Sequence, residues 1–194
     1  MRTFCKGILF VIGFLVAFPM IFLSWLETWL TGNNCERAFS ACKEILSIIP
    51  TPLGNYMRRA FYWATCTSVS WNTNFIFGSW LAHRNNKIAQ RVTIGAYSFI
   101  GYADIGENVL FGARVSIVSG KYQHGRPDQR VNQEETEDEN VIIKIGRNSW
   151  IGQDVVIMAN IGENCTVGAG SVVMKDVPDN STVLGNPARK VNLK

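Results

Sequence analysis

The sequence predicts a mainly β protein in which a prism-shaped β-helix follows an N-terminal membrane helix and short amphipathic helices. Three observations carry this prediction. An apolar run stands near the N-terminus, helical periodicity follows it, and from about residue 76 aliphatic residues recur at every sixth position. We expect a membrane anchor at 1–30, an amphipathic helical lead-in at 31–70 and the β-helix at 71–194, with a loop extruded at about 119–143.

The first part is an expected membrane anchor. Residues 8–26 are apolar apart from Ser24, and a bilayer span requires a run of about twenty apolar residues. A buried core helix is the less favoured alternative, because the run offers no polar face to water. Arg2 and Lys6 would also suit a secretory signal peptide, but residues 27–30 provide no small-residue cleavage site.

Pro19 leaves the path of this anchor open. A straight span with Arg2 and Lys6 in the cytosol would place the rest of the chain across the membrane. Because proline removes a helix hydrogen bond, the segment could instead kink or turn back as a re-entrant hairpin, with both ends on one face.

A first amphipathic helix should follow the anchor. Asn33 and Glu36 have the spacing of a capping box, and apolar residues then recur at intervals of three and four. The helix should end near Pro50 and Pro52.

A second short helix is expected at about 55–65. There Arg58 and Arg59 stand beside three aromatic residues, Phe61, Tyr62 and Trp63. Cationic and aromatic side chains together suit the headgroup layer of a bilayer. The alternative is that the aromatic residues form a plug over one end of the next domain, and both interpretations can hold together.

The third part carries an internal repeat. Its aliphatic or small residues lie six apart and continue after slips of phase, as Ile76, Ala82, Ile88, Ile94 and Ile100, then Ile105, Phe111 and Ile117, then Ile145, Ile151 and Ile157, then Ile161, Val167 and Val173. An amphipathic helix cannot keep this period, and an antiparallel meander needs wider and less regular turn signals. A prism-shaped coil can keep a period of six. Each hexapeptide then forms one short strand whose aliphatic residue faces the axis.

One insertion breaks the repeat, between Ser119 and about Val141. It contains His124 within residues 122–128 and an acidic run at 134–139. Insertions in solenoids form loops on one face, which is often the binding face. The acidic run is most simply a solvated tip and receives no chemical role.

Charge and composition exclude several classes of function. The net charge of +4 is modest and scattered, which disfavours nucleic-acid binding and leaves anionic headgroups or phosphate-bearing substrates as partners. The five cysteines lack close metal-ligand pairs and are expected to be reduced thiols. With two histidines, a zinc site of three histidines cannot form within one chain.

These motifs make the sequence similar to the hexapeptide-repeat acyltransferases, left-handed parallel β-helix enzymes that include the maltose, galactoside and xenobiotic O-acetyltransferases. The repeat, the histidine-bearing loop and a closing stretch carry the resemblance over about 76–191. The closing stretch consists of residues 148–152, 161–164, 168–178 and 185–189. A weaker resemblance, over 46–50 and 54–62, is to members associated with polysaccharide and lipopolysaccharide decoration.

The resemblance implies transfer of an acetyl group from acetyl-CoA, or of another acyl group from its acyl-CoA, to a hydroxyl of a glycan or lipid-linked saccharide. His124 matches the family's catalytic histidine, and an imidazole can take the proton of the attacking hydroxyl and return it to the thiolate. The resemblance also implies a homotrimer without a catalytic metal. We expect a membrane-associated protein with its catalytic domain on the cytoplasmic face, because coenzyme A is cytosolic. A re-entrant anchor would remove the conflict with a straight span, and both paths stay open.

The resemblance also implies a coenzyme site. Its residues would be a tryptophan beside the groove, small and polar residues along the pantetheine, and cations at the phosphates and adenosine, namely Trp150, Gln153, Ala169, Gly170, Lys175 and Arg189. As alternatives, Ala169 and Gly170 are plain corner residues and Lys175 is an ordinary surface lysine. A family asparagine has no match near Gly101 and Tyr102, so the acceptor geometry stays open.

Other interpretations remain. His83 is most simply structural, with acceptor binding as the alternative. The reaction could be N-acyl transfer to an amino sugar, or the chain could be a non-catalytic scaffold subunit of a glycan-assembly machine.

Overall fold

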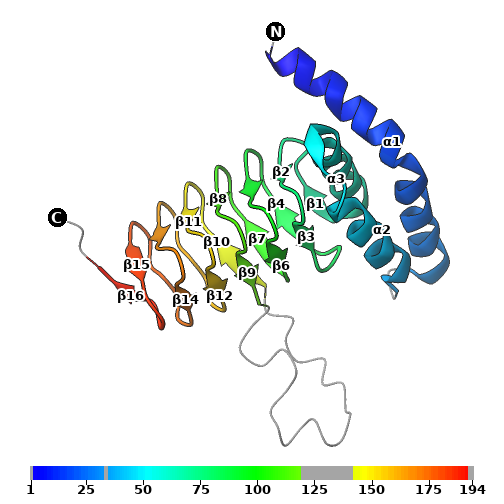
Figure 1. Ribbon diagram of the computed structural model, residues 1–194. Helices are drawn as coiled ribbons and strands as arrows, with labels where there is room; N and C mark the ends of the chain where they lie inside the picture. Colours follow the sequence, from blue (N-terminus) through cyan, green and yellow to red (C-terminus); the bar gives the residue numbers. More distant parts are fainter. Residues whose placement is uncertain (1, 33–34, 119–141, 192–194) are drawn as a thin grey trace, which may run out of the picture.

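The computed structural model describes residues 2–32, 35–118 and 142–191, so His124 and most of the inserted loop lie outside the described residues (Figure 1). Three helices gather at one end of a column of short strands: α1 (Arg2–Thr31), α2 (Arg37–Ser47) and α3 (Thr51–Thr65). The column extends away from them toward the C-terminus (Figure 1).

The strands form three sheets that wrap around one axis. Sheet A contains β1 (Ser68–Val69), β4 (Lys87–Ile88), β7 (Ala103–Ile105) and β10 (Ile143–Ile145). Sheet B contains β2 (Asn74–Phe75), β5 (Thr93–Ile94), β8 (Leu110–Phe111), β11 (Trp150–Ile151), β13 (Thr166–Val167), β15 (Thr182–Leu184) and β16 (Arg189–Lys190). Sheet C contains β3 (Trp80–Leu81), β6 (Phe99–Ile100), β9 (Ser116–Ile117), β12 (Val156–Ile157) and β14 (Val172–Val173).

From β1 to β12 successive strands visit sheets A, B and C in turn, and after β12 the chain passes the sheet A side only as the bridges of Ile161 and Val177. Strands of one sheet pair in parallel from coil to coil. The exception is β16, which returns antiparallel to β15 at the C-terminal end. This is the parallel β-helix that a six-residue period predicts. The mainly β fold class and the N-terminal apolar helix are confirmed.

Most strands bury one residue toward the axis, whereas β7 and β10 bury two and β16 buries none. In sheet B the inward column consists of Phe75, Ile94, Phe111, Ile151, Val167 and Val183. From Ile94 to Val167 these are the residues that the period predicts. The column buries an apolar side chain at every coil, each worth about 1.5–3 kcal/mol on burial.

The predicted phase is wrong by one residue in the first coil. Phe75 and Leu81 are fully buried, whereas Ile76 is 37% exposed and Ala82 only partly buried. Phe75 and Ile76 are both apolar, so the sequence does not distinguish them. The buried choice is set by packing, since Phe75 lies 4.6 Å from the ring of Tyr62 in α3.

Side chains of the helices cover the open end of the β-helix. Asn55 accepts a hydrogen bond from the amide of Phe75 at 3.1 Å, and the Tyr62 hydroxyl accepts one from Leu81 at 3.2 Å. The guanidinium of Arg58 donates to the carbonyl of Phe75 at 2.9 Å, and that of Arg59 donates to Trp71 at 2.8 Å. These bonds satisfy backbone groups that an uncovered sheet edge would leave unpaired.

The plug interpretation of this segment is therefore confirmed, and the headgroup interpretation of its arginines is wrong. Arg58 and Arg59 are 1% and 2% exposed, so neither can reach lipid headgroups. Phe61 and Tyr62 are fully buried, and Trp63 remains exposed. The helix also begins earlier than expected, at Thr51, because Pro52 fits the first turn of a helix, where no amide partner is needed.

The predicted capping box is wrong as well. Helix α2 begins at Arg37 with Glu36 as its N-cap residue, and the Glu36 side chain makes no cap hydrogen bond. Asn33 lies outside the described residues. The first amides of α2 instead bond to Glu27 of α1, from Ala38 at 2.6 Å and from Phe39 at 3.1 Å.

Helix α1 is long and apolar enough to cross a membrane by length and composition. It does not turn back at Pro19, because one helix continues from Arg2 to Thr31 with the proline inside it. It lies on the outer side of α3, across the N-terminal end of the solenoid (Figure 1).

Candidate active site

The corner between sheets C and A positions the candidate catalytic loop. The chain leaves β9 after Val118, whose amide donates to Ile157, and it rejoins sheet A where Ile143 donates to the carbonyl of Tyr102. The inserted segment 119–141 therefore starts and ends at this corner. We call the line of equivalent corners on successive coils the loop edge; among the described residues it comprises 82–86, 101–102, 118, 142, 158–160 and 174–176.

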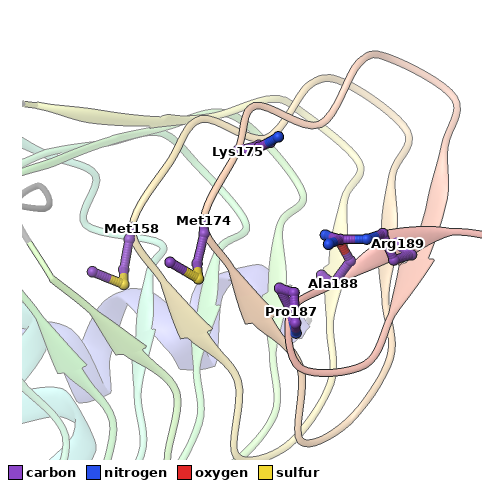
Figure 2. Close-up of a pocket in the computed structure, with 6 residues that line it drawn as sticks. All are labelled: Met158, Met174, Lys175, Pro187, Ala188 and Arg189. Atoms are coloured by element: carbon purple, nitrogen blue, oxygen red, sulfur yellow. The ribbon is translucent and has the colours of Figure 1, made fainter.

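A pocket of about 250 Å³ lies at the C-terminal end of the loop edge. Its walls are two methionines, one lysine and the C-terminal tail, namely Met158, Met174, Lys175, Pro187, Ala188 and Arg189. Figure 2 shows the two methionine side chains side by side on successive coils, with Lys175 and Arg189 on the same rim. The structure thus brings together the two cations expected at the coenzyme phosphates.

The two methionines were missed from the sequence. Met158 and Met174 each follow the inward residue of a sheet C strand and hold equivalent positions on adjacent coils. This repetition after Ile157 and Val173 was the available signal. A flexible thioether wall beside two cations can accommodate an apolar chain that carries phosphates.

The other expected coenzyme residues lie elsewhere on the chain. Gln153, Ala169 and Gly170 are exposed on the corner between sheets B and C, where the Gly170 amide donates to the Gln153 carbonyl at 2.8 Å. Gly170 has φ +70°, and no atom lies within 4 Å of the position that a Cβ would take there. Trp150 is 47% exposed on sheet B, beside Leu110 and Thr166.

One chain therefore does not unite the predicted coenzyme residues. In the triangular cross-section, sheet B is the side opposite the loop edge. Lys175 and Arg189 lie at the loop-edge pocket, whereas Trp150 lies on sheet B.

The loop edge also carries an ordered imidazole near the helices. The Nδ1 atom of His83 lies 3.1 Å from a carboxylate oxygen of Glu36, and its ring stacks on Tyr102 at 4.0 Å with an interplanar angle of 6°. Burial raises the pKa of Glu36, but hydrogen bonds from His83 and the backbone of Arg84 outweigh burial and leave that pKa lowered. The carboxylate therefore stays charged and fixes the ring.

Among the residues that the structure describes, no group of three or more histidine, cysteine, aspartate or glutamate side chains could hold a metal ion. Cys35, Cys42, Cys66 and Cys165 are free thiols. Burial raises the pKa of the Cys66 thiol, which makes it a poor nucleophile at neutral pH.

Comparisons with known proteins agree with this architecture. The family described as bacterial transferase hexapeptide (six repeats) matches residues 142–175, and the hexapeptide repeat of succinyl-transferase matches residues 102–120. No curated protein matches the chain in sequence.

Two solved structures are similar over most of the chain. A maltose O-acetyltransferase from Clostridium difficile is 25% identical, with a TM-score of 0.56, covering 81% of this chain and 85% of that one. A hexapeptide-repeat containing acetyltransferase from Vibrio cholerae is 21% identical, also with a TM-score of 0.56, covering 80% of this chain and 89% of the other. The second likeness supports the fold.

Proposed function

Since hexapeptide-repeat transferase models match two segments of the chain and a maltose O-acetyltransferase shares its fold, we propose that it is a membrane-associated O-acyltransferase of this kind. It transfers an acetyl or similar acyl group from acyl-CoA to a hydroxyl of a glycan or lipid-linked saccharide. The likeness to a maltose O-acetyltransferase supports a sugar hydroxyl as the acceptor. The catalytic domain faces the cytoplasm, where acyl-CoA is available.

The observation that carries this proposal is the shared loop edge. The pocket lined by Lys175 and Arg189 lies on the edge from which the segment bearing His124 leaves the solenoid. Two cations beside a narrow apolar wall suit the phosphates and the pantetheine arm of coenzyme A. The loop root lies one coil before Met158, so a thioester extending from the pocket along the edge would approach the loop.

The proposed reaction needs one base and no metal. His124 takes the proton from the acceptor hydroxyl as its oxygen attacks the thioester carbonyl carbon. The tetrahedral intermediate then collapses, the carbon–sulfur bond breaks, and the imidazolium returns the proton to the thiolate. The products are the acyl ester and free coenzyme A.

A homotrimer would complete the site. Side-by-side packing of three solenoids sets the loop edge of one chain beside a face of its neighbour. Trp150, Gln153, Ala169 and Gly170 would then be supplied by the neighbouring subunit to a coenzyme bound at Lys175 and Arg189. The separation of these two groups within one chain supports this arrangement.

Turnover assays with the detergent-solubilised chain test the proposal. Release of free coenzyme A from acetyl-CoA is measured against a panel of glycans and lipid-linked sugars. We expect His124→Ala to lower kcat by about 10²- to 10⁴-fold. Full turnover in this variant would contradict the assignment of the base and would direct the same assay to His83→Gln.

A second variant tests the coenzyme pocket. Lys175→Ala should raise the KM for acetyl-CoA about tenfold with kcat nearly unchanged, because a phosphate contact stabilises the ground and transition states equally. The matched control is Lys87→Ala, an exposed lysine in β4 on sheet A, which should leave both parameters unchanged. Equal effects of the two variants would contradict a coenzyme site at the pocket.

Paired acceptors separate the alternatives. Matched sugars that carry a hydroxyl or an amine at the same carbon distinguish O-acyl from N-acyl transfer. Calorimetric titration with coenzyme A addresses the scaffold alternative, which predicts no binding.

A further inference from the structure

One stripe of helix α1 faces the rest of the protein. Ala17, Ile21 and Ser24 are fully buried, and their spacing of four and three places them on one side of a helix. Gly13 continues the stripe by close packing, since a Cβ there would lie 2.7 Å from the backbone carbon of Tyr56 in α3. The stripe ends at Glu27, whose carboxylate pairs with Arg84 at 2.6 Å.

Helices α2 and α3 cover the first end of the solenoid, and we call them, together with α1, the helical cap. The contacts of the buried stripe attach most of α1 to the rest of this cap. Near one end, the ring of Phe10 lies 5.6 Å from Trp63 and 5.9 Å from Trp71. Near the other, the Trp25 indole donates to the carbonyl of Ala64 at 2.8 Å. The stretch from Phe10 to Glu27 corresponds to about 26 Å of helix, so α1 forms an outer layer of the cap.

The remaining sides of α1 are apolar and uncovered. No charged side chain stands between Lys6 and Glu27, and the best window of the helix has a mean hydropathy of 2.5 with only 22% of its residues buried. Large exposed residues of this surface include Ile8, Val11, Leu15, Phe18, Phe22, Trp25 and Trp29. An apolar surface of this extent marks a protein or membrane contact.

We infer that α1 lies in the plane of a membrane, with its uncovered apolar sides among lipid acyl chains and the Gly13–Ser24 stripe against the protein. A perpendicular α1 would carry α3 and the first coil to the same depth. That coil exposes Ser68 and Asn85, and the next coil begins with the exposed Lys87. These polar and charged side chains are costly inside the hydrocarbon core.

The in-plane orientation also fits the other features of the cap. Because α1 lies across the end of the solenoid (Figure 1), the β-helix projects from the membrane, and the helices of the proposed trimer share one plane. Trp63 and Trp71 are exposed beside α1, where their amphipathic rings suit the interfacial layer. Lys6 and the solenoid then lie on one side of the membrane, without a hairpin.

Depth measurements on the full chain test this inference. The chain, with its native cysteines replaced by serine or alanine, is reconstituted into phosphatidylethanolamine–phosphatidylglycerol vesicles. Spin labels are attached to Leu9→Cys, Val16→Cys and Leu23→Cys, and their depth is measured by power saturation with oxygen and a nickel chelate. All three positions lie on the exposed sides of α1.

An in-plane helix places the three labels at nearly equal depth within the lipid. A spanning helix separates Leu9 from Leu23 by about 21 Å along the membrane normal, and that result would overturn the inference. Labels accessible to water throughout would also overturn it, and labels immobilised in a lipid-free oligomer would assign the surface to a second copy of the chain. Leu110→Cys, on exposed sheet B, is the control and should remain in water.

A protease experiment gives a second readout. With cleavable tags at both ends of the chain, an in-plane helix leaves both tags cleaved or both protected in sealed vesicles. Cleavage of one tag with protection of the other would demonstrate a span. Neither experiment needs acyl transfer, so a failure here is distinguishable from a failure of the proposed function.

Discussion

The helical cap and the solenoid both satisfy buried backbone amides and carbonyls, but by different means. In the solenoid, strand amides donate to carbonyls on the neighbouring coil, and the interior is a column of apolar side chains. In the cap, charged side chains are buried and bond to backbone carbonyls, as Arg58, Arg59 and Lys43 do. In a stack of repeats each coil pairs with its neighbours, so only the two end coils have unpaired backbone groups. At the N-terminal end, side chains of the helices bond to these groups.

The largest loss of stability is expected on substitution of a buried arginine of the cap. Arg58 donates to the carbonyls of Leu46 and Ile49 at 2.8 Å and of Phe75 at 2.9 Å. Arg58→Met removes this donor from all three carbonyls and should lower the free energy of unfolding by about 3 kcal/mol. Denaturant unfolding of the full chain, followed by circular dichroism, measures this loss.

The matched control for Arg58→Met is an arginine on the solenoid surface. Arg91 pairs with Glu107 at 3.2 Å and is more than half exposed. Arg91→Met should cost less than about 1 kcal/mol, because exposed ion pairs are screened by solvent. Equal losses for the two variants would show that the buried arginine does not complete the end of the solenoid.

A smaller effect is expected where the coils approach each other closely. A Cβ at Gly95 would collide with the backbone carbonyl oxygen of Gly112 on the next coil, so Gly95→Ala should cost roughly 2 kcal/mol through displaced coils. Gly170 has open space but a positive φ, and Gly170→Ala should cost about 1 kcal/mol. Thermal unfolding of both variants tests the order, and a greater loss at Gly170 would contradict it.

The smallest expected effect is a dependence of the stability on pH, caused by Glu36 where the cap meets the solenoid. Hydrogen bonds lower the pKa of Glu36 despite its partial burial. The stabilisation from this carboxylate is therefore present above the ordinary glutamate pKa of about 4.3. It is lost as the pH falls through the lower pKa of the folded state.

Glu36→Gln tests this linkage. We expect the wild type to lose about 1 kcal/mol more than the variant when unfolding is compared at neutral pH and in acid. The same loss in both proteins would contradict a role for the Glu36–His83 pair in stability.

The sequence predicted the solenoid better than the cap, for a physical reason. A residue such as Ile151 faces the axis because of its place in a local period, which is visible within a few positions of the chain. Phe75 and Ile76 are equivalent by that criterion, and the choice between them depends on Tyr62 of α3. The pairing of Glu27 with Arg84 joins positions far apart in the sequence, so no local spacing announces it.

The candidate site likewise has residues that the sequence predicted and residues whose placement only the structure shows. The presence of Lys175 and Arg189 in one pocket agrees with the family resemblance, while Met158 and Met174 were visible only as a repeated position. The distribution of Trp150 and Gln153 away from that pocket follows from coil geometry, which spacing along the chain does not reveal. The role of His124 remains a prediction.

The residues on either side of the inserted segment have a consequence for how acceptor specificity can change between related proteins. Val118 and Ile143 keep their ladder hydrogen bonds on either side of it, and β9 and β10 stay in register with their neighbours. Folding of the scaffold is thereby separated from the content of the insertion. Exchange of this segment between related chains should retarget the acceptor while the thermal stability of the host stays within a few degrees, which makes the loop edge a natural graft point.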